Sequence, residues 1–260
     1  MRLLPLSSAR PWKVEISQLL KFYLNLNKSF VDPIYCRIPV EETLYLRMGL
    51  SNSVGRNLRK PSGSLTGAVV KRLIKNKNAY LEHNAVRLCR LESRHHILEV
   101  GFGPGIGLKA ACDIIKDGKV YGIDYSKEML ADVTKSLQSE IASGRLQVVF
   151  GDAASLPYSD ALMDRIFHCN CFYFWPEPAT VAGELYRVLK PGGFMVTTMN
   201  VASVAAAAEK GFLKGTNWNP EQYMDVLRST GFQDVTMEDL VHEDSGNGGT
   251  TYQAIMAHKN

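Results

Sequence analysis

The sequence has few cysteines and no long apolar segment. Its 260 residues include five cysteines, an odd and sparse set: Cys36, Cys89, Cys112, Cys169 and Cys171. This count excludes a disulfide-stapled fold and favours a reducing compartment. Zinc-type cysteine pairs are missing too, so we predict no metal site. No apolar run reaches the roughly 18 residues needed to cross a bilayer, so no transmembrane segment is expected.

The composition otherwise suits a globular protein. Hydrophobic residues make up 45% and charged residues 22% of the chain, which excludes a fully disordered or collagen-like protein. The length fits one large domain, or one domain with a modest extension.

Positive charge is concentrated at the start of the chain. Residues 1–75 contain 13 Lys and Arg against 4 Asp and Glu, whereas residues 76–260 contain 17 against 22. We therefore divide the chain into a basic extension over residues 1–52, a helical cap or lid over 53–94 and a main domain over 95–260. A basic segment is suited to an anionic partner or to a targeting role.

The basic start lacks the features of a secretory signal, but it is compatible with a mitochondrial transit peptide or with a surface helix over residues 14–28. We expect a cytoplasmic protein, with the mitochondrion as the alternative. The polar loop at 53–63 contains Arg56, Arg59 and Lys60. These residues form either a solvated basic loop or a lid over a ligand-binding pocket of the main domain. The sequence leaves the oligomeric state undetermined.

Strand-like and helix-like segments alternate from residue 95 onward. Strands are predicted at 95–100, 119–124, 146–152, 164–171, 194–200, 235–240 and 252–258. Helices are predicted at 65–74, 79–91, 106–115, 127–142, 178–189 and 221–229. This alternation predicts a doubly wound, parallel α/β sheet. The last two strands have no helix between them, so they should form an antiparallel hairpin at one edge.

The first predicted strand ends in a glycine-rich turn, Glu99-Val-Gly101-Phe-Gly103-Pro-Gly105-Ile-Gly107. Glycines allow the backbone to approach a ligand closely, and the following helix N-terminus carries a positive dipole end. A dinucleotide fingerprint would need glycine at position 106, which is Ile106, so an NAD site is disfavoured.

Two further acids end the next two strands. Asp124 is placed to accept hydrogen bonds from ribose hydroxyls, and Asp152 to face an adenine amino group. Because parallel strand ends meet at one edge of the sheet, Glu99, Asp124 and Asp152 together predict a nucleoside-binding site there.

These segments resemble the class I S-adenosylmethionine-dependent methyltransferases, in the motifs ILEVGFGPGIG, VYGIDYSKEML, VVFGDAASLPYSD and LYRVLKPGG. The resemblance implies a Rossmann-like, seven-stranded sheet, mostly parallel with an antiparallel last strand, and an N-terminal helical cap. It implies S-adenosylmethionine as the cofactor and methyl transfer as the reaction. It also implies a set of cofactor-binding residues: Glu99, Gly101, Gly103, Gly105, Asp124, Tyr125, Met129, Asp152, Ala153 and Asn170.

A narrower resemblance comes from RKPSG (59–63) and NCFYFWPEP (170–178). They are similar to a subgroup of small bacterial-type methyltransferases whose substrate is not established. This supports the fold and the cofactor but leaves the methyl acceptor open.

Methyl transfer from a sulfonium requires positioning, and requires a base only when the nucleophile arrives protonated. His168 and Tyr173 are the candidate catalytic residues. His168 falls inside a strand, so a packed core histidine is the alternative, and Tyr173 and Trp175 either line a substrate pocket or cover the sheet edge. Cys169 and Cys171 are expected to be buried strand residues.

The acceptor class remains open at this point. A small molecule is the favoured acceptor. The spacing of Asn170 and Tyr173 matches an N-P-P-Y motif of amino-group methyltransferases acting on DNA or protein, but both prolines are missing. Only the excess of positive charge at the start of the chain supports a nucleic-acid partner. A catalytically idle S-adenosylmethionine-binding protein is the alternative from another functional class.

Overall fold

The computed structural model describes residue 57, residues 78–243 and residues 249–260. These residues belong to one compact unit, Met48–Asn260. The predicted extension, the helices at 14–28 and 65–74, and the proposed lid residues Arg56, Arg59 and Lys60 lie outside the described residues. The domain boundaries therefore stay predictions.

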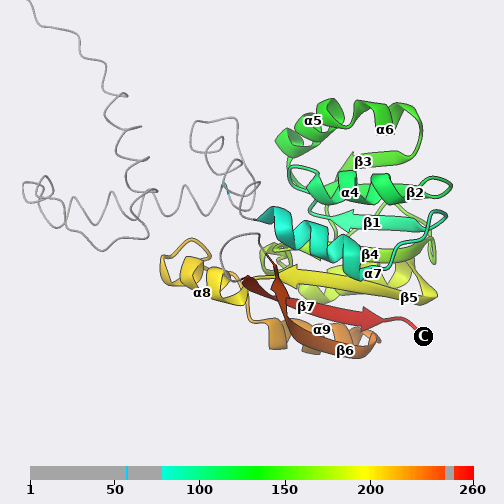
Figure 1. Ribbon diagram of the computed structural model, residues 1–260. Coiled ribbons are helices and arrows are strands. Elements are labelled where there is room, and N and C mark those ends of the chain that lie inside the picture. The colour runs from blue at the N-terminus through cyan, green and yellow to red at the C-terminus, as the bar shows by residue number, and fades with distance from the viewer. Residues whose placement is uncertain (1–56, 58–77, 244–248) are drawn as a thin grey trace, which may run out of the picture. The chain divides into compact units, whose positions relative to one another are not determined.

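A seven-stranded sheet with the order β3-β2-β1-β4-β5-β7-β6 forms the centre of the domain (Figure 1). The pairs within β3-β2-β1-β4-β5 are parallel, whereas β7 is antiparallel to both β5 and β6. The strands are β1 (His96–Val100), β2 (Lys119–Asp124), β3 (Leu146–Phe150), β4 (Met163–Cys169), β5 (Leu189–Met199), β6 (Gln233–His242) and β7 (Thr250–His258). The predicted Rossmann-like fold with an antiparallel last strand is confirmed.

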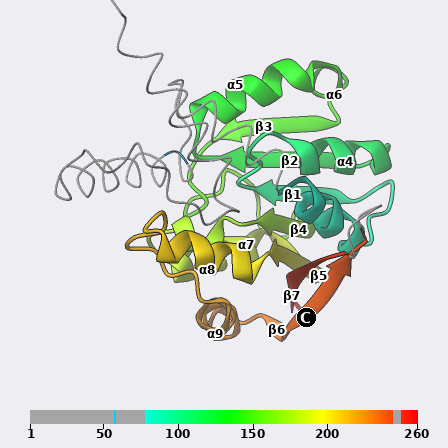
Figure 2. The same ribbon diagram turned by 60° about the vertical axis from the view of Figure 1, so that its left-hand side comes forward.

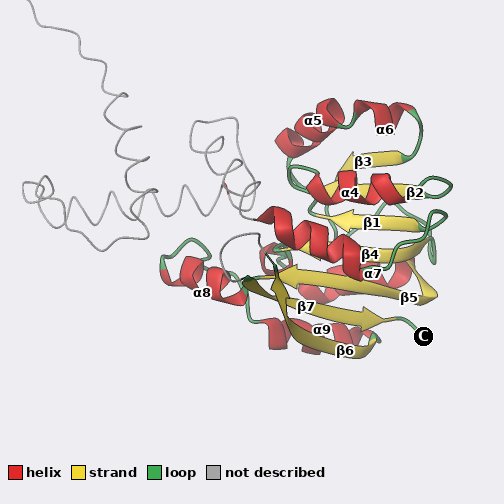
Figure 3. Ribbon diagram, in the orientation of Figure 1, coloured by secondary structure: helices red, strands yellow, loops and turns green. Residues whose placement is uncertain are grey.

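Helices flank both faces of this sheet (Figure 3). They are α4 (Ile106–Ile114), α5 (Lys127–Ser136), α6 (Gln138–Ala142), α7 (Pro178–Val188), α8 (Val201–Glu209) and α9 (Pro220–Thr230), with a 3-10 turn η3 (Phe172–Phe174) after β4. A further helix is described over residues 78–88. In Figure 2, α4 and this further helix lie on one side of the sheet and α7 on the other.

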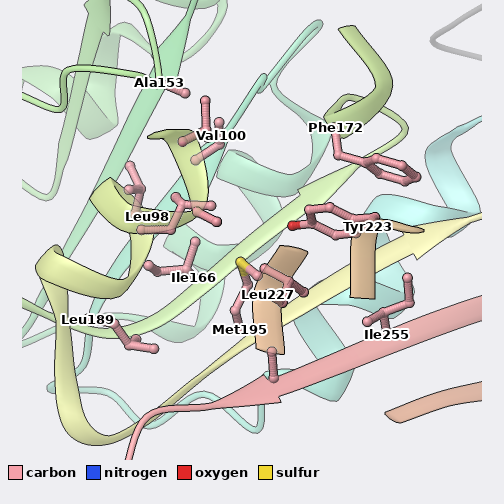
Figure 4. Packing of buried hydrophobic residues seen from close by; sticks show 14 of the residues in the cluster. Leu98, Val100, Ala153, Ile166, Phe172, Leu189, Met195, Tyr223, Leu227 and Ile255 are labelled. Carbon is pink, nitrogen blue, oxygen red and sulfur yellow. The ribbon is translucent and has the colours of Figure 1, made fainter. Parts of the chain in front are cut away.

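The alternation of side chains along each strand divides the core into two layers. Leu98 of β1 packs with the residues of α7 and α9, whereas the neighbouring Ile97 packs with those of α4, α5 and the 78–88 helix. Figure 4 shows part of the first layer, in which Leu227 of α9 lies near Met195 of β5. Glu99 follows Leu98, so its side chain belongs to the α4 side.

The 78–88 helix is part of the domain core. Its Ala85 and Val86 pack beneath α4, and Leu81 packs against Tyr252 of β7. The Thr198 hydroxyl also donates a 3.1 Å hydrogen bond to the Leu81 carbonyl. This segment is therefore fixed against the sheet, and its side chains are held in place beside the glycine-rich turn.

Several local predictions differ from the structure. β3 ends at Phe150 and β4 at Cys169, so Asp152 and Cys171 lie in the loops that follow and not on the strands as predicted. The predicted helix over 127–142 is two helices, because Leu137 leaves the helical conformation (φ −114°, ψ 32°) while its side chain packs into the core. β5 begins at Leu189, not at residue 194, since Leu189 already pairs with Met163 before a register shift. We did not predict α8, although the Asn200 side chain caps it by accepting a 2.8 Å hydrogen bond from Ser203 N–H.

Candidate functional site

The candidate site lies where the strand order reverses. β1 pairs with β2 on one side and with β4 on the other, and all three strands are parallel. Their carboxyl ends therefore meet at one edge, at the topological switch point where open α/β sheets bind ligands. The glycine-rich turn, Asp124 and Asn170 all come to this edge.

The turn after β1 requires its glycines. Gly101, Gly103 and Gly105 have φ values of +71°, +48° and +79°, a left-handed region that disfavours other residues. A Cβ added at Gly103 would meet nothing within 4 Å, whereas one at Gly101 would lie 3.1 Å from Cys171 Cβ. The turn therefore has open space next to Gly103, whereas at Gly101 it packs against the loop after β4.

Asp124 at the end of β2 holds this turn in place. Its Oδ2 accepts a 2.9 Å hydrogen bond from Gly103 N–H, and its Oδ1 accepts a 2.8 Å hydrogen bond from Ser126 N–H. Ser126 in turn caps α5, because its hydroxyl accepts from Met129 N–H. Each carboxylate oxygen keeps a further lone pair, so Asp124 retains the capacity to accept from ribose hydroxyls.

Two buried glutamates occupy the N-terminus of α4. Glu82, on the 78–88 helix, accepts hydrogen bonds from the N–H groups of Ile106 and Gly107, the latter at 2.8 Å. Glu99 accepts from Leu108 N–H, while its Oε2 is buried without a hydrogen-bond partner. A Cβ at Gly107 would lie 2.6 Å from Glu99 Oε1. Glycine is required here because Glu99 passes so close to the helix.

Burial dominates the acid–base properties of this edge. Burial raises the pKa of Glu82 to about 7, against the lowering effect of its two backbone hydrogen bonds. Burial together with the charges of Glu82 and Asp124 raises the pKa of Glu99 well above its usual range. Burial also raises the pKa of Asp124, although the N–H donors of Gly103 and Ser126 oppose this shift.

This arrangement fits a cationic ligand better than an anionic one. The N–H groups that would bind a pyrophosphate at the start of α4 already donate to Glu82 and Glu99. Among the described residues, two buried oxygens at this edge have no hydrogen-bond partner, Glu99 Oε2 and Asn170 Oδ1, and an ammonium or amide donor would satisfy them.

Asn170 follows β4 in a strained conformation. It has a φ of +49°, which is uncommon for a residue with a side chain. Its N–H donates a 3.2 Å hydrogen bond to the Thr198 carbonyl, while its buried Oδ1 has no partner. Backbone strain of this kind is often found at functional sites, and Asn170 lies next to Cys171, which contacts Gly101.

Of the four residues expected beside the adenosine, two are exposed and two are buried. Tyr125 is 51% exposed and stacks on Phe150, with 5.9 Å between the ring centroids. Met129 is 2% exposed and packs in the core beneath α5. Asp152 is exposed and accepts a 3.0 Å hydrogen bond from Ala154 N–H, and Ala153 is buried near Val100. Tyr125 and Asp152 therefore have the exposed surface that ligand contact requires.

The candidate catalytic residues are both buried. His168 Nε2 lies 2.9 Å from the Tyr223 hydroxyl and 2.8 Å from the Thr197 hydroxyl. Burial lowers the pKa of His168 to about 3, so the imidazole is neutral at physiological pH. Burial raises the pKa of the Tyr173 hydroxyl, which keeps it protonated. The packing of His168 corresponds to the core-histidine alternative.

Aromatic rings surround His168 and continue along the loop after β4. Trp175 meets the His168 ring edge-on at 5.0 Å between centroids, and Phe172 stacks on Tyr223 at 4.3 Å (Figure 4). Phe174 and Trp175 stay partly exposed at the border of this cluster. The loop thus presents aromatic surface next to Asn170.

Glu82 is the residue of this edge that sequence reasoning missed. A signal was present, because Glu82 shares a helical stripe with Ala85, Val86 and Cys89, all of which are buried. A charged residue on an apolar stripe is buried only when it has partners. The partners here are on α4, more than twenty residues further along the chain, so the sequence alone does not identify them.

Comparison with known proteins agrees with this fold. Residues 98–197 match the methyltransferase domain family described as "Methyltransferase domain". An uncharacterized methyltransferase of Bacillus subtilis, YdaC, is 28% identical over 142 residues, which is 55% of this chain and 74% of that protein. The demethylmenaquinone methyltransferase of Oceanobacillus iheyensis is 38% identical over 79 residues, covering 30% of this chain and 33% of the relative.

Solved structures share the same architecture. An S-adenosylmethionine-dependent methyltransferase from Aquifex aeolicus superimposes with a TM-score of 0.55 at 21% identity, over 73% of this chain and 96% of that one. At this identity the likeness concerns the fold.

The sheet order and the matched segment are similar to those of the class I S-adenosylmethionine-dependent methyltransferases. Residues 98–197 thus form a methyltransferase domain, and S-adenosylmethionine is its cofactor. None of the helices in the described ranges is long and apolar enough to cross a membrane.

Proposed function

We propose that the protein transfers a methyl group from S-adenosylmethionine to a small-molecule acceptor that binds beside the loop after β4. When bound, the cofactor supplies a methyl group already activated on a sulfonium. The protein then needs to orient the two reactants and exclude water.

The residues at the sheet edge would each bind a different part of the cofactor. Asp124 would accept from the ribose hydroxyls, and Tyr125 and Asp152 would lie beside the adenosine. Glu99 would face the positively charged methionine end from β1, and Asn170 would approach it from β4. Gly103 offers open space for the ligand, since a Cβ added to this residue would meet nothing within 4 Å.

One observation carries the choice of a small acceptor: in the aromatic loop after β4, next to Asn170, Phe174 and Trp175 stay partly exposed. Such an aromatic wall suits a small, largely apolar molecule. The name of the Oceanobacillus relative, a demethylmenaquinone methyltransferase, supports an acceptor of this kind.

The environment of His168 bears on the mechanism. Its imidazole is fully buried and hydrogen-bonded to two hydroxyl groups, so it is poorly placed to remove a proton from an acceptor. We infer that the acceptor reaches the site with its nucleophile already unprotonated, or loses its proton to water.

A labelling experiment tests the proposed acceptor class. The purified full chain is incubated with methyl-labelled S-adenosylmethionine and either the low-molecular-mass or the macromolecular fraction of a cell extract. We expect label in a low-molecular-mass product, and none with the Asp124→Ala variant. Label found only in protein or nucleic acid would favour the amino-group alternative suggested by the spacing of Asn170 and Tyr173. Cofactor binding without any transfer would favour an idle binding protein.

A further inference from the structure

We propose that Glu82 is a positioning residue of the cofactor site that shares one proton with Glu99, and that binding of the cationic cofactor releases this proton to solvent. The proposal rests on the cofactor site assigned above. It concerns a residue that lies outside the matched methyltransferase segment, on the helix over residues 78–88.

The two carboxyl groups meet at the first turn of α4. Glu82 Oε2 lies 2.8 Å from Gly107 N, and Glu99 Oε1 would lie 2.6 Å from a Cβ on the same residue. Glu82 is 6% exposed and Glu99 is 1% exposed. Glu82 thus accepts from Gly107 N–H while Glu99 passes close to the same glycine, and both acids are held away from bulk water.

The donors present stabilise one negative charge better than two. The N–H groups of Ile106, Gly107 and Leu108 are the hydrogen-bond donors to the pair, and the helix N-terminus adds a partial positive charge of roughly half a unit. Glu99 Oε2 has no donor among the residues that the structure describes. Two neighbouring carboxyl groups in such a setting share a proton, because like charges at short range do not both ionise.

Within the described part of the chain, the other ionisable groups that interact with the pair add no positive charge. From the described elements packed against it, the groups that interact electrostatically with Glu82 or Glu99 are Cys89, Asp124, Cys169 and Cys171. Burial raises the pKa of the three thiols, so they are neutral, and Asp124 contributes a negative charge. A cationic ligand would supply the positive charge that this group of residues lacks, and the shared proton would then leave.

Proton-linked calorimetry tests the proposal. Binding of S-adenosylmethionine to the full chain is measured in buffers of different ionisation enthalpy from about pH 6 to pH 8, around the raised pKa of Glu82. We expect the wild type to release up to one proton on binding. Its affinity should then increase with pH, by at most about tenfold per pH unit.

The Glu82→Gln variant isolates the charge. Its amide oxygen can still accept from Gly107 N–H, but it cannot carry the shared proton. We expect the proton release and the pH dependence of affinity to become clearly smaller, with the remainder coming from Glu99, whose pKa burial also raises. Glu238→Gln, which removes one charge from the exposed face of edge strand β6, should behave as the wild type.

Three results would overturn the proposal, and they are distinguishable. Undiminished proton release by a folded Glu82→Gln variant would assign Glu82 a purely structural role. Absence of proton release in the wild type would rule out a shared proton, and this measurement does not depend on whether the variant folds. Failure of the wild type to bind S-adenosylmethionine would refute the cofactor site itself, and with it the proposed function.

Discussion

Gly103 N–H donates a 2.9 Å hydrogen bond to Asp124 Oδ2, which ties the glycine-rich turn after β1 to the end of β2. The ligand-binding loop and the acid expected to hold the ribose are therefore one structural unit. A change at Asp124 removes a ligand contact and also releases the turn that shapes the site.

Asp124→Ala should abolish measurable binding of S-adenosylmethionine. Hydrogen bonds to a charged group contribute about 1.5–3 kcal/mol each, so the loss of ribose contacts and of loop anchoring should weaken binding by roughly 100-fold or more. Isothermal titration calorimetry measures this directly. Asp113→Asn, on the exposed face of α4, is the control and should bind normally. Retained affinity in Asp124→Ala would show that the ribose side of the site is misassigned.

Gly103→Ala should impair binding far more than stability. Both Gly103 (φ +48°) and Gly144 (φ +77°) have left-handed backbones with nothing near an added Cβ, so either alanine costs about 1–2 kcal/mol of stability. The new methyl group at residue 103 would enter the proposed cofactor space, whereas residue 144 lies in the turn before β3. We expect at least a tenfold loss of affinity for Gly103→Ala alone. Equal affinities of the two variants would contradict the placement of the cofactor over this turn.

Most of the fold can be predicted from the sequence, because helices and strands each produce a characteristic hydrophobic pattern within a short stretch of chain. β2 is predicted with its observed bounds, Lys119–Asp124, and α9 ends at Gly231 in a left-handed conformation, as its glycine indicates. The errors occur where tertiary packing overrides local pattern. Leu137 interrupts the predicted helix over 127–142 because its side chain is drawn into the core.

The site is predictable only as far as its residues lie on strand ends. Glu99, Gly103 and Asp124 follow from the rule that parallel strand ends meet at one edge. Glu82 does not follow, since its contact with Gly107 spans 25 positions and arises from the docking of a separate helix. The pairing of His168 with Tyr223, 55 positions apart, is of the same kind.

Gly107→Ala should destabilise the protein, in contrast to Gly183→Ala. A Cβ at Gly107 would lie 2.6 Å from Glu99 Oε1 and 2.8 Å from Phe167 Cε2, whereas one at Gly183 meets nothing within 4 Å. Overpacking of this kind costs about 1–3 kcal/mol. In α7, replacing glycine by alanine should instead stabilise the protein by up to about 1 kcal/mol. Urea denaturation measures both effects, and a stable Gly107→Ala variant would argue against the close contact with Glu99.

Tyr223→Phe should cost about 1 kcal/mol of unfolding free energy, because it removes the hydroxyl bonded to buried His168 while keeping the stacked ring. Tyr186→Phe, a change of the same atoms at a partly exposed position, should stay within about 0.5 kcal/mol of the wild type. If His168 has only this packing role, cofactor affinity should not change in Tyr223→Phe. A large loss of methyl transfer at unchanged stability would instead return His168 to the catalytic candidates.

The raised pKa of Glu82 predicts how stability depends on pH. The carboxyl titrates at about 4.5 in the unfolded chain and at about 7 in the folded protein, so between these values the folded state holds the extra proton. Unfolding free energy should therefore fall as pH rises from about 4.5 to 7, and the contribution of Glu82 should be constant above that range. Glu82→Gln should show a shallower decline, although Glu99, whose pKa is also raised, keeps part of it. Urea denaturation of both proteins without cofactor gives the two curves. Parallel curves across this range would show that Glu82 is already ionised in the folded protein, and would contradict the shared proton independently of any ligand.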